Sequence, residues 1–308
     1  MSNAPTAFIQ LRQQRDFSAT VSTGFAFLRQ NWKPLSRALL FLCVPIHLLS
    51  SVLIGSFFEG FGEGVTRLAG SSFLVMFLGY VTFLLAMLMG NVVVLEYMGY
   101  YERHGGARPT VLQLWGTIRG LLITYVGIGF LLTLMFLVVY FICVFIGIML
   151  GRITLAFTFV VIFSVIAYFL TVWSFSLPLK AFERASFGDC LFQPFVLIRG
   201  NWWKSFFIFL FTSVLVGLMT YAVVGVPFAL LGIFTDMSGL GPRSFEPSPS
   251  GMAFFAGMAF VLIAGLVNTF LQPMLLCSVG CNVYSVLEQR RGIGLMRRVD
   301  TLSFAPQA

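Results

Sequence analysis

The chain has 308 residues, of which 58% are hydrophobic and only 10% are charged, and its mean hydropathy is +0.94. Soluble domains carry about 25% charged residues. This composition excludes a soluble globule and predicts a chain whose apolar side chains face lipid or other helices. The formal net charge of +8 does not indicate nucleic-acid binding, because no basic surface with interleaved aromatic residues exists outside the flanks of the apolar runs.

The N-terminal segment comes before any apolar run. Residues 1–15 are polar and basic, and we expect them to be mobile. Residues 16–33 form an amphipathic helix pattern with Asp16 as the N-cap. Its apolar stripe has the helical spacing 4, 4, 3, 4 and consists of Phe17, Val21, Phe25, Leu28 and Trp32. Such a helix is expected to lie flat at the membrane interface.

Six apolar segments long enough to cross a bilayer follow, since a helix needs about 20 apolar residues to do so. They are residues 35–58, 72–97, 121–147, 153–178, 206–233 and 252–280. The third and fourth are joined by a few residues around Gly151 and Arg152, which predicts a tight hairpin. Residues 234–250 are rich in Gly, Pro and Ser, which predicts a flexible loop and not a folded domain.

The basic residues give these segments an orientation. All but three of the 19 Lys and Arg residues lie on one side, in the N-terminal segment, in 98–120, in 179–205 and in the C-terminal tail. The other three are Arg67, Arg152 and Arg243. Cytoplasmic loops of membrane proteins are enriched in Lys and Arg. Both termini are therefore predicted to be cytoplasmic.

The amphipathic helix recurs along the chain. Its stripe returns 170 residues later as Phe187, Leu191, Phe195, Ile198 and Trp202. Arg29 and Asn31 also return, as Arg199 and Asn201. A shorter third copy is predicted at 110–119, with Thr110 as its N-cap.

The even-numbered spans also end alike. The closing pairs are Glu102-Arg103 and Glu183-Arg184, and the last span closes with Glu288-Gln289-Arg290. The predicted unit is an interfacial helix, a span out and a span back, used three times in the same sense. Repeats of this parallel kind are related by an axis along the membrane normal.

A few polar residues lie within the apolar spans and are candidates for a polar path. They are Asn91, Glu96, Asn268 and Gln272. Glu96 is either an interfacial anchor, whose carboxylate reaches water, or a functional site. Asn268 and Gln272, next to Pro273, either bond across helices or bind a polar ligand.

Clusters of basic and aromatic residues flank two of the spans and are candidate contacts to lipid headgroups. They comprise Arg29, Trp32, Lys33, Arg199, Trp202, Trp203 and Lys204. Trp prefers the headgroup level, and Arg pairs with phosphate through two parallel hydrogen bonds. The alternative interpretation is an ordinary aromatic belt with cytoplasmic positive charge.

No catalytic, cofactor or metal site is predicted. Metalloprotease, nucleophile-elbow and phosphate-loop motifs are absent from the sequence. The five cysteines lie mostly in or beside apolar spans and are interpreted as small buried hydrophobes. Cys277 and Cys281 are one helical turn apart, but with only two histidines in the chain we expect no metal there. His47 is expected to bond to a neighbouring backbone group.

Four segments carry a resemblance: FAFLRQNW (25–32), FERASFGD (182–189), LIRGNWWKSF (197–206) and SVLEQRRGIGL (285–295). They resemble an uncharacterised family of bacterial six-span integral-membrane proteins. That family is similar in pattern to the membrane domain found beside some glycerophosphodiester phosphodiesterases. The resemblance implies fold and a bacterial inner-membrane location, and it brings no catalytic residues. The chain lacks the paired carboxylates and His ligands of a phosphodiesterase, so that activity is not implied.

The sequence thus predicts an all-α polytopic helix bundle with six transmembrane helices and two or three interfacial helices. Residues 1–33 form the N-terminal segment, 34–290 the membrane domain and 291–308 the C-terminal tail. The expected function is a non-enzymatic accessory or scaffold component of a membrane or envelope system. The alternative is a transporter or lipid-handling protein. Expected partners are membrane lipids, with another membrane protein as a candidate, and the oligomeric state is not predicted.

Overall fold

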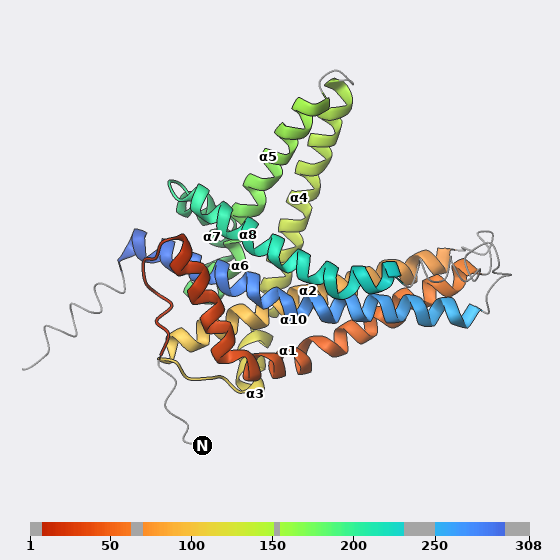
Figure 1. The fold of residues 1–308 in the computed structure, drawn as a ribbon, viewed down its shortest axis with the longest axis horizontal. Coiled ribbons are helices and arrows are strands. Elements are labelled where there is room, and N and C mark those ends of the chain that lie inside the picture. Colours follow the sequence, from red (N-terminus) through yellow and green to blue (C-terminus); the bar gives the residue numbers. More distant parts are fainter. Residues whose placement is uncertain (1–7, 63–69, 151–154, 231–249, 293–308) are drawn as a thin grey trace, which may run out of the picture. The chain divides into compact units, whose positions relative to one another are not determined.

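The computed structural model describes residues 8–62, 70–150, 155–230 and 250–292, and these residues fold into helices without a strand (Figure 1). The tight hairpin predicted at Gly151 and Arg152 lies outside the described residues, as does nearly all of the predicted loop 234–250. Arg67, Arg243 and the tail from residue 293 also lie outside them. The all-α architecture is confirmed.

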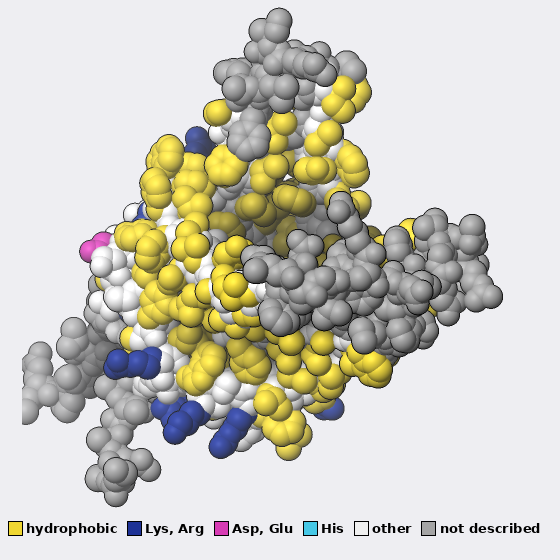
Figure 2. Space-filling view, turned by 45° about the vertical axis from the view of Figure 1, so that its right-hand side comes forward, with side chains coloured by type: hydrophobic (Ala, Val, Ile, Leu, Met, Phe, Trp, Pro, Cys, Tyr) yellow, Lys and Arg dark blue, Asp and Glu magenta, His cyan; other side chains and the backbone are white. Residues whose placement is uncertain are grey.

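Six helical segments among the described residues are long and apolar enough to cross a membrane, as predicted. They are Phe17–Phe57, Phe73–Arg103, Leu122–Ile146, Ile162–Glu183, Trp202–Leu230 and Gly257–Arg291. Large apolar side chains on them are exposed, including Ile123 at 85% and Phe130 at 70%. Hydrophobic side chains cover most of the described face in Figure 2. Exposed apolar surface of this extent is typical of a chain surrounded by lipid.

The chain divides into two compact units. Unit 1 comprises residues 1–32, 94–212 and 274–308, and unit 2 comprises residues 33–93 and 213–273. Helices α1 (Phe17–Gly62), α2 (Gly70–Arg103), α8 (Trp202–Thr220) and α10 (Ser250–Arg291) each contribute residues to both units. The remaining labelled α-helices, α3 to α7, belong to unit 1.

Helix α1 corrects one prediction. Asp16 caps it as expected, since the Ala19 N–H donates to Asp16 Oδ1 at 2.7 Å. However, residues 17–33 are not a separate helix, because α1 continues through Pro34. Pro34 has no N–H to offer the Gln30 carbonyl. The Arg108 guanidinium donates to that carbonyl instead, at 3.4 Å.

The fourth predicted span also differs from the structure. Residues 153–178 were expected to be one helix, but α5 (Leu155–Trp173) ends before α6 (Ser176–Glu183) begins. At the junction the Phe175 N–H bonds to the Val172 carbonyl, three residues back, which tightens the turn. Helix α5 runs back alongside α4 (Leu122–Leu150), and the two form a helical hairpin within unit 1 (Figure 1).

In the fifth span, α8 passes into a π-helical turn at Tyr221–Gly225 before the helix resumes at Val226. Pro227 explains the wide turn, because it lacks the N–H that an α-helix would direct to the Val223 carbonyl. The Val226 N–H bonds instead to the Tyr221 carbonyl, five residues back.

The predicted copies of the amphipathic helix share their caps. Thr110 caps α3 (Val111–Arg119) in a capping box with Gln113, and Ser186 caps α7 (Phe187–Leu197). Ser186 lies 170 residues after Asp16. Its hydroxyl donates to Asp189 Oδ2 at 2.6 Å, and this hydrogen bond lowers the pKa of the exposed Asp189 carboxyl.

The copies also share their burial pattern. In residues 17–30 of α1 the buried positions are Thr20, Val21, Gly24, Phe27 and Leu28. In α7 and its C-cap they are Cys190, Leu191, Pro194, Leu197 and Ile198, each 170 residues later. The buried residues of α3, Leu114 and Ile118, precede Pro194 and Ile198 by 80 residues. The buried positions of the predicted copies therefore have the same spacing, and the internal repeat itself stays a prediction.

The first copy and the copy at α7 differ in whether the helix breaks at their end. Gly200 has a φ of +85°, and there the chain turns before α8 begins. The residue 170 positions earlier is Gln30, which stays within α1. A residue with a side chain rarely adopts a positive φ. The glycine therefore permits a break between α7 and α8 that the first copy does not have.

Candidate functional site

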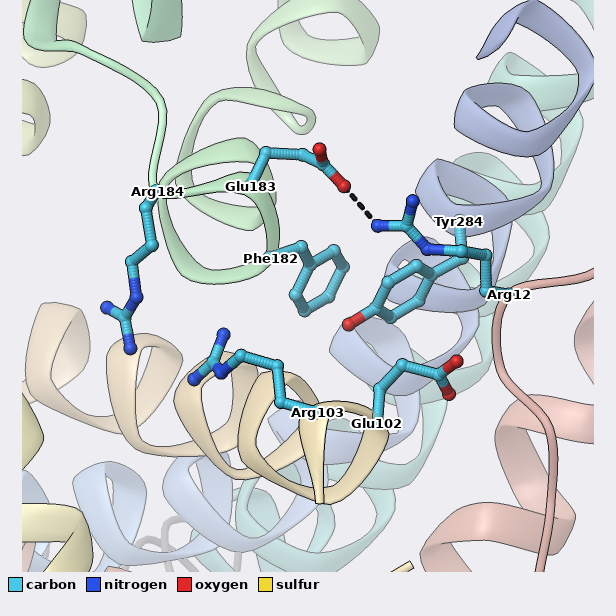
Figure 3. Close-up of a pocket in the computed structure, with 7 residues that line it drawn as sticks. All are labelled: Arg12, Glu102, Arg103, Phe182, Glu183, Arg184 and Tyr284. Atoms are coloured by element: carbon cyan, nitrogen blue, oxygen red, sulfur yellow. Dashed lines mark hydrogen bonds and ion pairs between the residues drawn. The ribbon is translucent and has the colours of Figure 1, made fainter. Parts of the chain in front are cut away.

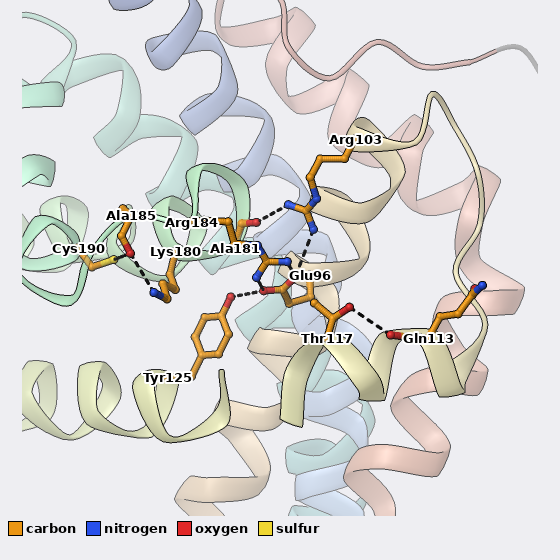
Figure 4. Close-up of polar contacts among 10 residues, drawn as sticks. All are labelled: Glu96, Arg103, Gln113, Thr117, Tyr125, Lys180, Ala181, Arg184, Ala185 and Cys190. Atoms are coloured by element: carbon orange, nitrogen blue, oxygen red, sulfur yellow. Dashed lines mark hydrogen bonds and ion pairs between the residues drawn. The ribbon is translucent and has the colours of Figure 1, made fainter. Parts of the chain in front are cut away.

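Glu96 forms the most strongly paired site in unit 1. Its side chain is fully buried, and Arg184 clamps it from α6 with Nη1 at 2.7 Å from Oε1 and Nη2 at 3.0 Å from Oε2 (Figure 4). The Tyr125 hydroxyl donates to Oε1 at 2.5 Å, and Arg103 Nη2 lies 3.5 Å from Oε2. A buried carboxylate is tolerated only when it is paired and hydrogen-bonded, and this one is both.

Three helices position these partners. Arg103 is the last residue of α2, and its Nη1 also donates to the Ala181 carbonyl at 2.8 Å. Tyr125 lies in the first turn of α4. Arg184 caps the C-terminus of α6 with a φ of +53°, the one non-glycine residue with positive φ in the described ranges. Backbone strain at such a residue costs about 1–3 kcal/mol. The fork of hydrogen bonds to Glu96 offsets that strain.

This geometry corrects one interpretation of Glu96. As an interfacial anchor, its carboxylate was expected to reach water, but it is enclosed by two guanidiniums and a phenol. The partners could not be read from the sequence, because Arg184 lies 88 residues away. The sequence showed only that similar Glu-Arg pairs close the even-numbered spans. In the structure, Arg103 and Arg184 from two of these pairs bind Glu96.

The other candidates for a polar path lie in unit 2. Asn268 donates to the sulfur of Met87 at 2.9 Å, and Asn91 and Gln272 are half-buried. Glu96 belongs to unit 1, so a polar path that joins the four residues stays a prediction.

His47 lies in a buried polar pair within unit 2. Its Nε2 is 2.8 Å from the Thr269 hydroxyl, and its ring packs edge-on against Phe83. The expected bond to a neighbouring backbone group is therefore wrong, and the partner is a side chain on another helix. The Nδ1 atom of His47 is buried without a hydrogen-bond partner.

The N-terminal segment is attached to the ends of the spans. The Leu11 N–H donates to Glu102 at 3.0 Å, and the Ile9 N–H donates to the Tyr101 hydroxyl at 3.1 Å. Arg12 pairs with Glu183, which also pairs with Arg291 at 3.1 Å. Residues 1–15 were expected to be mobile, but this is wrong for residues 8–15, which are held by these contacts and contain the fully buried Leu11.

The candidate headgroup residues separate into two groups. Arg29, Trp32, Lys33, Arg199 and Trp203 are exposed, so their assignment to lipid contact stays a prediction. Lys204 instead donates to the Arg15 carbonyl and to the Ser285 hydroxyl. The Trp202 ring stacks on Phe206 and Tyr168, and its Nε1 is buried. Lys204 and Trp202 therefore take part in helix packing, and their assignment to lipid contact also stays a prediction.

Among the described residues, no group of three or more His, Cys, Asp or Glu side chains is arranged to hold a metal ion. Cys43, Cys190, Cys277 and Cys281 are buried free thiols. Burial also raises the pKa of Cys190, which lies outside the spans, to about 11. Such a thiol is protonated near neutral pH and is a poor nucleophile.

No protein-family model, curated protein or solved structure matches this chain. The resemblance to bacterial six-span membrane proteins and to the phosphodiesterase-associated membrane domain therefore stays a prediction. The site itself contains ion pairs that join α6 and its cap to α2, to α10 and to the N-terminal segment, and a hydrogen bond that joins α4 to α2. Chemically, this arrangement holds helices in register.

Proposed function

We propose that this protein is a non-enzymatic accessory or scaffold component of a membrane or envelope system. We place it in the bacterial inner membrane with both termini cytoplasmic. The single observation that carries the proposal is the enclosure of Glu96 by Arg184, Arg103 and Tyr125. An acid that transports or catalyses has to exchange partners, whereas this one is held by several at once.

The remaining ion pairs of unit 1 support the same function. Arg12 and Arg291 both pair with Glu183, and so connect the N-terminal segment and α10 to the end of α6. The Asn282 amide donates to the Ser205 hydroxyl at 2.9 Å, between α10 and α8. Polar contacts at several helix ends give a surface of fixed geometry, which a scaffold requires.

The test is purification from native membranes in mild detergent, with mass spectrometry of the proteins that co-elute. We expect a second membrane protein in a fixed ratio, and the ratio should survive a change of detergent. The Glu96→Gln variant should disturb the structure of unit 1 and should therefore lose that partner. The control variant Arg29→Gln, at an exposed site, should retain the partner. A protein that runs alone at every detergent concentration contradicts the proposal.

The alternative function, a transporter or lipid-handling protein, has one observation in its favour. Unit 2 contains polar side chains at apolar depth, namely the His47–Thr269 pair and the Asn268 amide on Met87. Intramembrane polar groups of this kind can line a path for ions or polar substrates.

Proteoliposomes loaded with a pH-sensitive dye would test that path under a proton gradient. If it conducts, His47→Phe or Asn268→Leu should abolish dye acidification while the protein still elutes as a folded species. The control variant Ser36→Ala, outside the polar pairs, should leave the flux unchanged. Equal acidification in empty and protein-containing vesicles removes this alternative for protons.

A further inference from the structure

A cavity of about 280 Å³ lies in unit 1 beside the Glu96 cluster, at the ends of three returning helices. Its lining comes from α2, from α6 with its cap, from α10 and from the N-terminal segment (Figure 3). The residues are Arg12, Glu102, Arg103, Phe182, Glu183, Arg184 and Tyr284. At about 30 Å³ per water, the cavity has the volume of roughly nine water molecules. It can therefore hold a small polar group with some of its hydration.

The charges around this cavity favour an anion. Glu183 is shared by Arg12 and Arg291, and Glu96 is shared by Arg184 and Arg103. These four guanidiniums outnumber the two carboxylates. When the carboxylate of Glu102 is counted as well, one positive charge remains in excess. A guanidinium has five N–H donors, more than any of these carboxylates can use. Arg12 and Arg103 therefore keep donors that a further acceptor can engage.

Tyr284 supplies an observation independent of charge. Its ring is 1% exposed and stacks on Phe182 with centroids 4.0 Å apart, while Arg12 lies over it with Cζ 5.7 Å from the ring centroid. None of the hydrogen bonds between described residues involves the Tyr284 hydroxyl. Figure 3 shows that hydroxyl directed into the space between Arg103 and Glu102. A buried phenol normally bonds to an acceptor, and the cavity provides the place for one.

We propose that this cavity binds a phosphate group, held by the guanidiniums of Arg12 and Arg103 and by the Tyr284 hydroxyl. Phosphate suits these donors because guanidinium forms paired hydrogen bonds to it and because its several oxygens accept from different directions. The phosphate belongs either to a phospholipid headgroup or to a soluble phosphate. This site is separate from the exposed Arg and Trp clusters, and it does not depend on the scaffold function.

The experiment uses the full chain in detergent and in nanodiscs. One arm titrates inorganic phosphate into the detergent-solubilised protein by calorimetry. The other arm compares retention of phosphatidic acid and of phosphatidylcholine by native mass spectrometry, after incubation with an equimolar mixture. Phosphate binding assigns the site to a soluble phosphate. Preferential retention of phosphatidic acid without phosphate binding assigns it to a headgroup.

Tyr284→Phe removes only the hydroxyl. In whichever experiment shows binding, this variant should bind roughly tenfold more weakly or worse, because it loses a hydrogen bond to a charged acceptor. Arg12→Gln should weaken it at least as much, and thermal unfolding would verify that both variants fold. The matched controls are Tyr221→Phe, with an exposed ring, and Arg119→Gln, with an exposed arginine outside the candidate headgroup residues. No binding in either arm, or binding that folded Tyr284→Phe leaves unchanged, overturns the proposal.

Discussion

The two units of this protein keep their helices together by different means. The ion pairs of Glu96 and Glu183 all lie in unit 1. Unit 2 relies on apolar packing and on neutral pairs such as His47 with Thr269. Neutral hydrogen bonds in membranes contribute only about 0.6 kcal/mol on average, whereas breaking a buried ion pair costs several times more. The difference indicates that specificity of helix arrangement resides mainly in unit 1.

The largest expected effect comes from leaving the buried carboxylate without its main partner. Arg184→Gln removes the fork on Glu96 and should cost about 3–5 kcal/mol of unfolding free energy. Glu96→Gln should cost less, about 1–3 kcal/mol, because the two guanidiniums it leaves are partly exposed and can hydrate. Unfolding by SDS, followed by circular dichroism, measures both. Equal losses of unfolding free energy for the two variants would contradict the expectation that the unpaired buried carboxylate costs more than the unpaired guanidiniums.

Close helix packing in unit 1 gives the next effect. A Cβ at Gly24 would lie 2.8 Å from the backbone of Ser278, so Gly24→Ala requires α1 and α10 to separate. Overpacking of this kind costs about 1–3 kcal/mol. The matched control is Gly116→Ala in α3, where a Cβ meets nothing within 4 Å and helix propensity improves. Thermal unfolding in detergent should show the first destabilised and the second not; a Gly24→Ala protein as stable as the control would be inconsistent with the close approach.

The break at Gly200 offers a comparison within the repeat. Gly200→Ala forces a side chain into a positive φ and should cost about 1–2 kcal/mol. Gln30→Gly, at the equivalent position inside α1, should cost at least about 0.5–1 kcal/mol, the backbone-entropy cost of a glycine within a helix. Denaturant titrations of the two variants measure the difference. If Gly200→Ala proved neutral, the turn between α7 and α8 would not need its glycine.

The smallest effect is expected in unit 2. Thr269→Val removes the hydroxyl that faces His47 Nε2 while keeping the shape of the side chain. The loss should be about 0.6 kcal/mol, the average for a hydrogen bond between membrane helices. The same SDS titration detects it. A loss as large as that of Arg184→Gln would erase the contrast between the units.

The sequence predicted the membrane helices well because their signal is local. Apolar length sets the spans, and Asp16 and Thr110 were predicted as N-caps from residue type and position, as the structure confirms. It did not predict the break between α5 and α6, although Pro178 in the first turn of α6 lacks the N–H that a continuous helix would direct to the Ser174 carbonyl. Propensity also failed at Pro34, through which α1 continues because Arg108 satisfies the freed carbonyl.

The sites depended on contacts between residues far apart in the chain. Glu96 and His47 were recognised as unusual, but their partners Arg184 and Thr269 lie 88 and 222 residues away. Lys204 was assigned to lipid contact because it follows Trp202 and Trp203 in the sequence. In the structure, the ammonium group of Lys204 donates to the carbonyl of Arg15. Such pairings follow from helix packing, which a single sequence does not encode locally.

The most direct test of the central claim is a double-mutant cycle between Glu96 and Arg184. The unfolding free energies of Glu96→Gln, Arg184→Gln and the double variant would be compared with that of the unchanged protein. If the pair holds the helix ends of unit 1 together, the double variant loses less than the sum of the single variants, by about 1–3 kcal/mol. A parallel cycle with the exposed Arg199→Gln should be additive. Additivity for Glu96 and Arg184 as well would contradict the account.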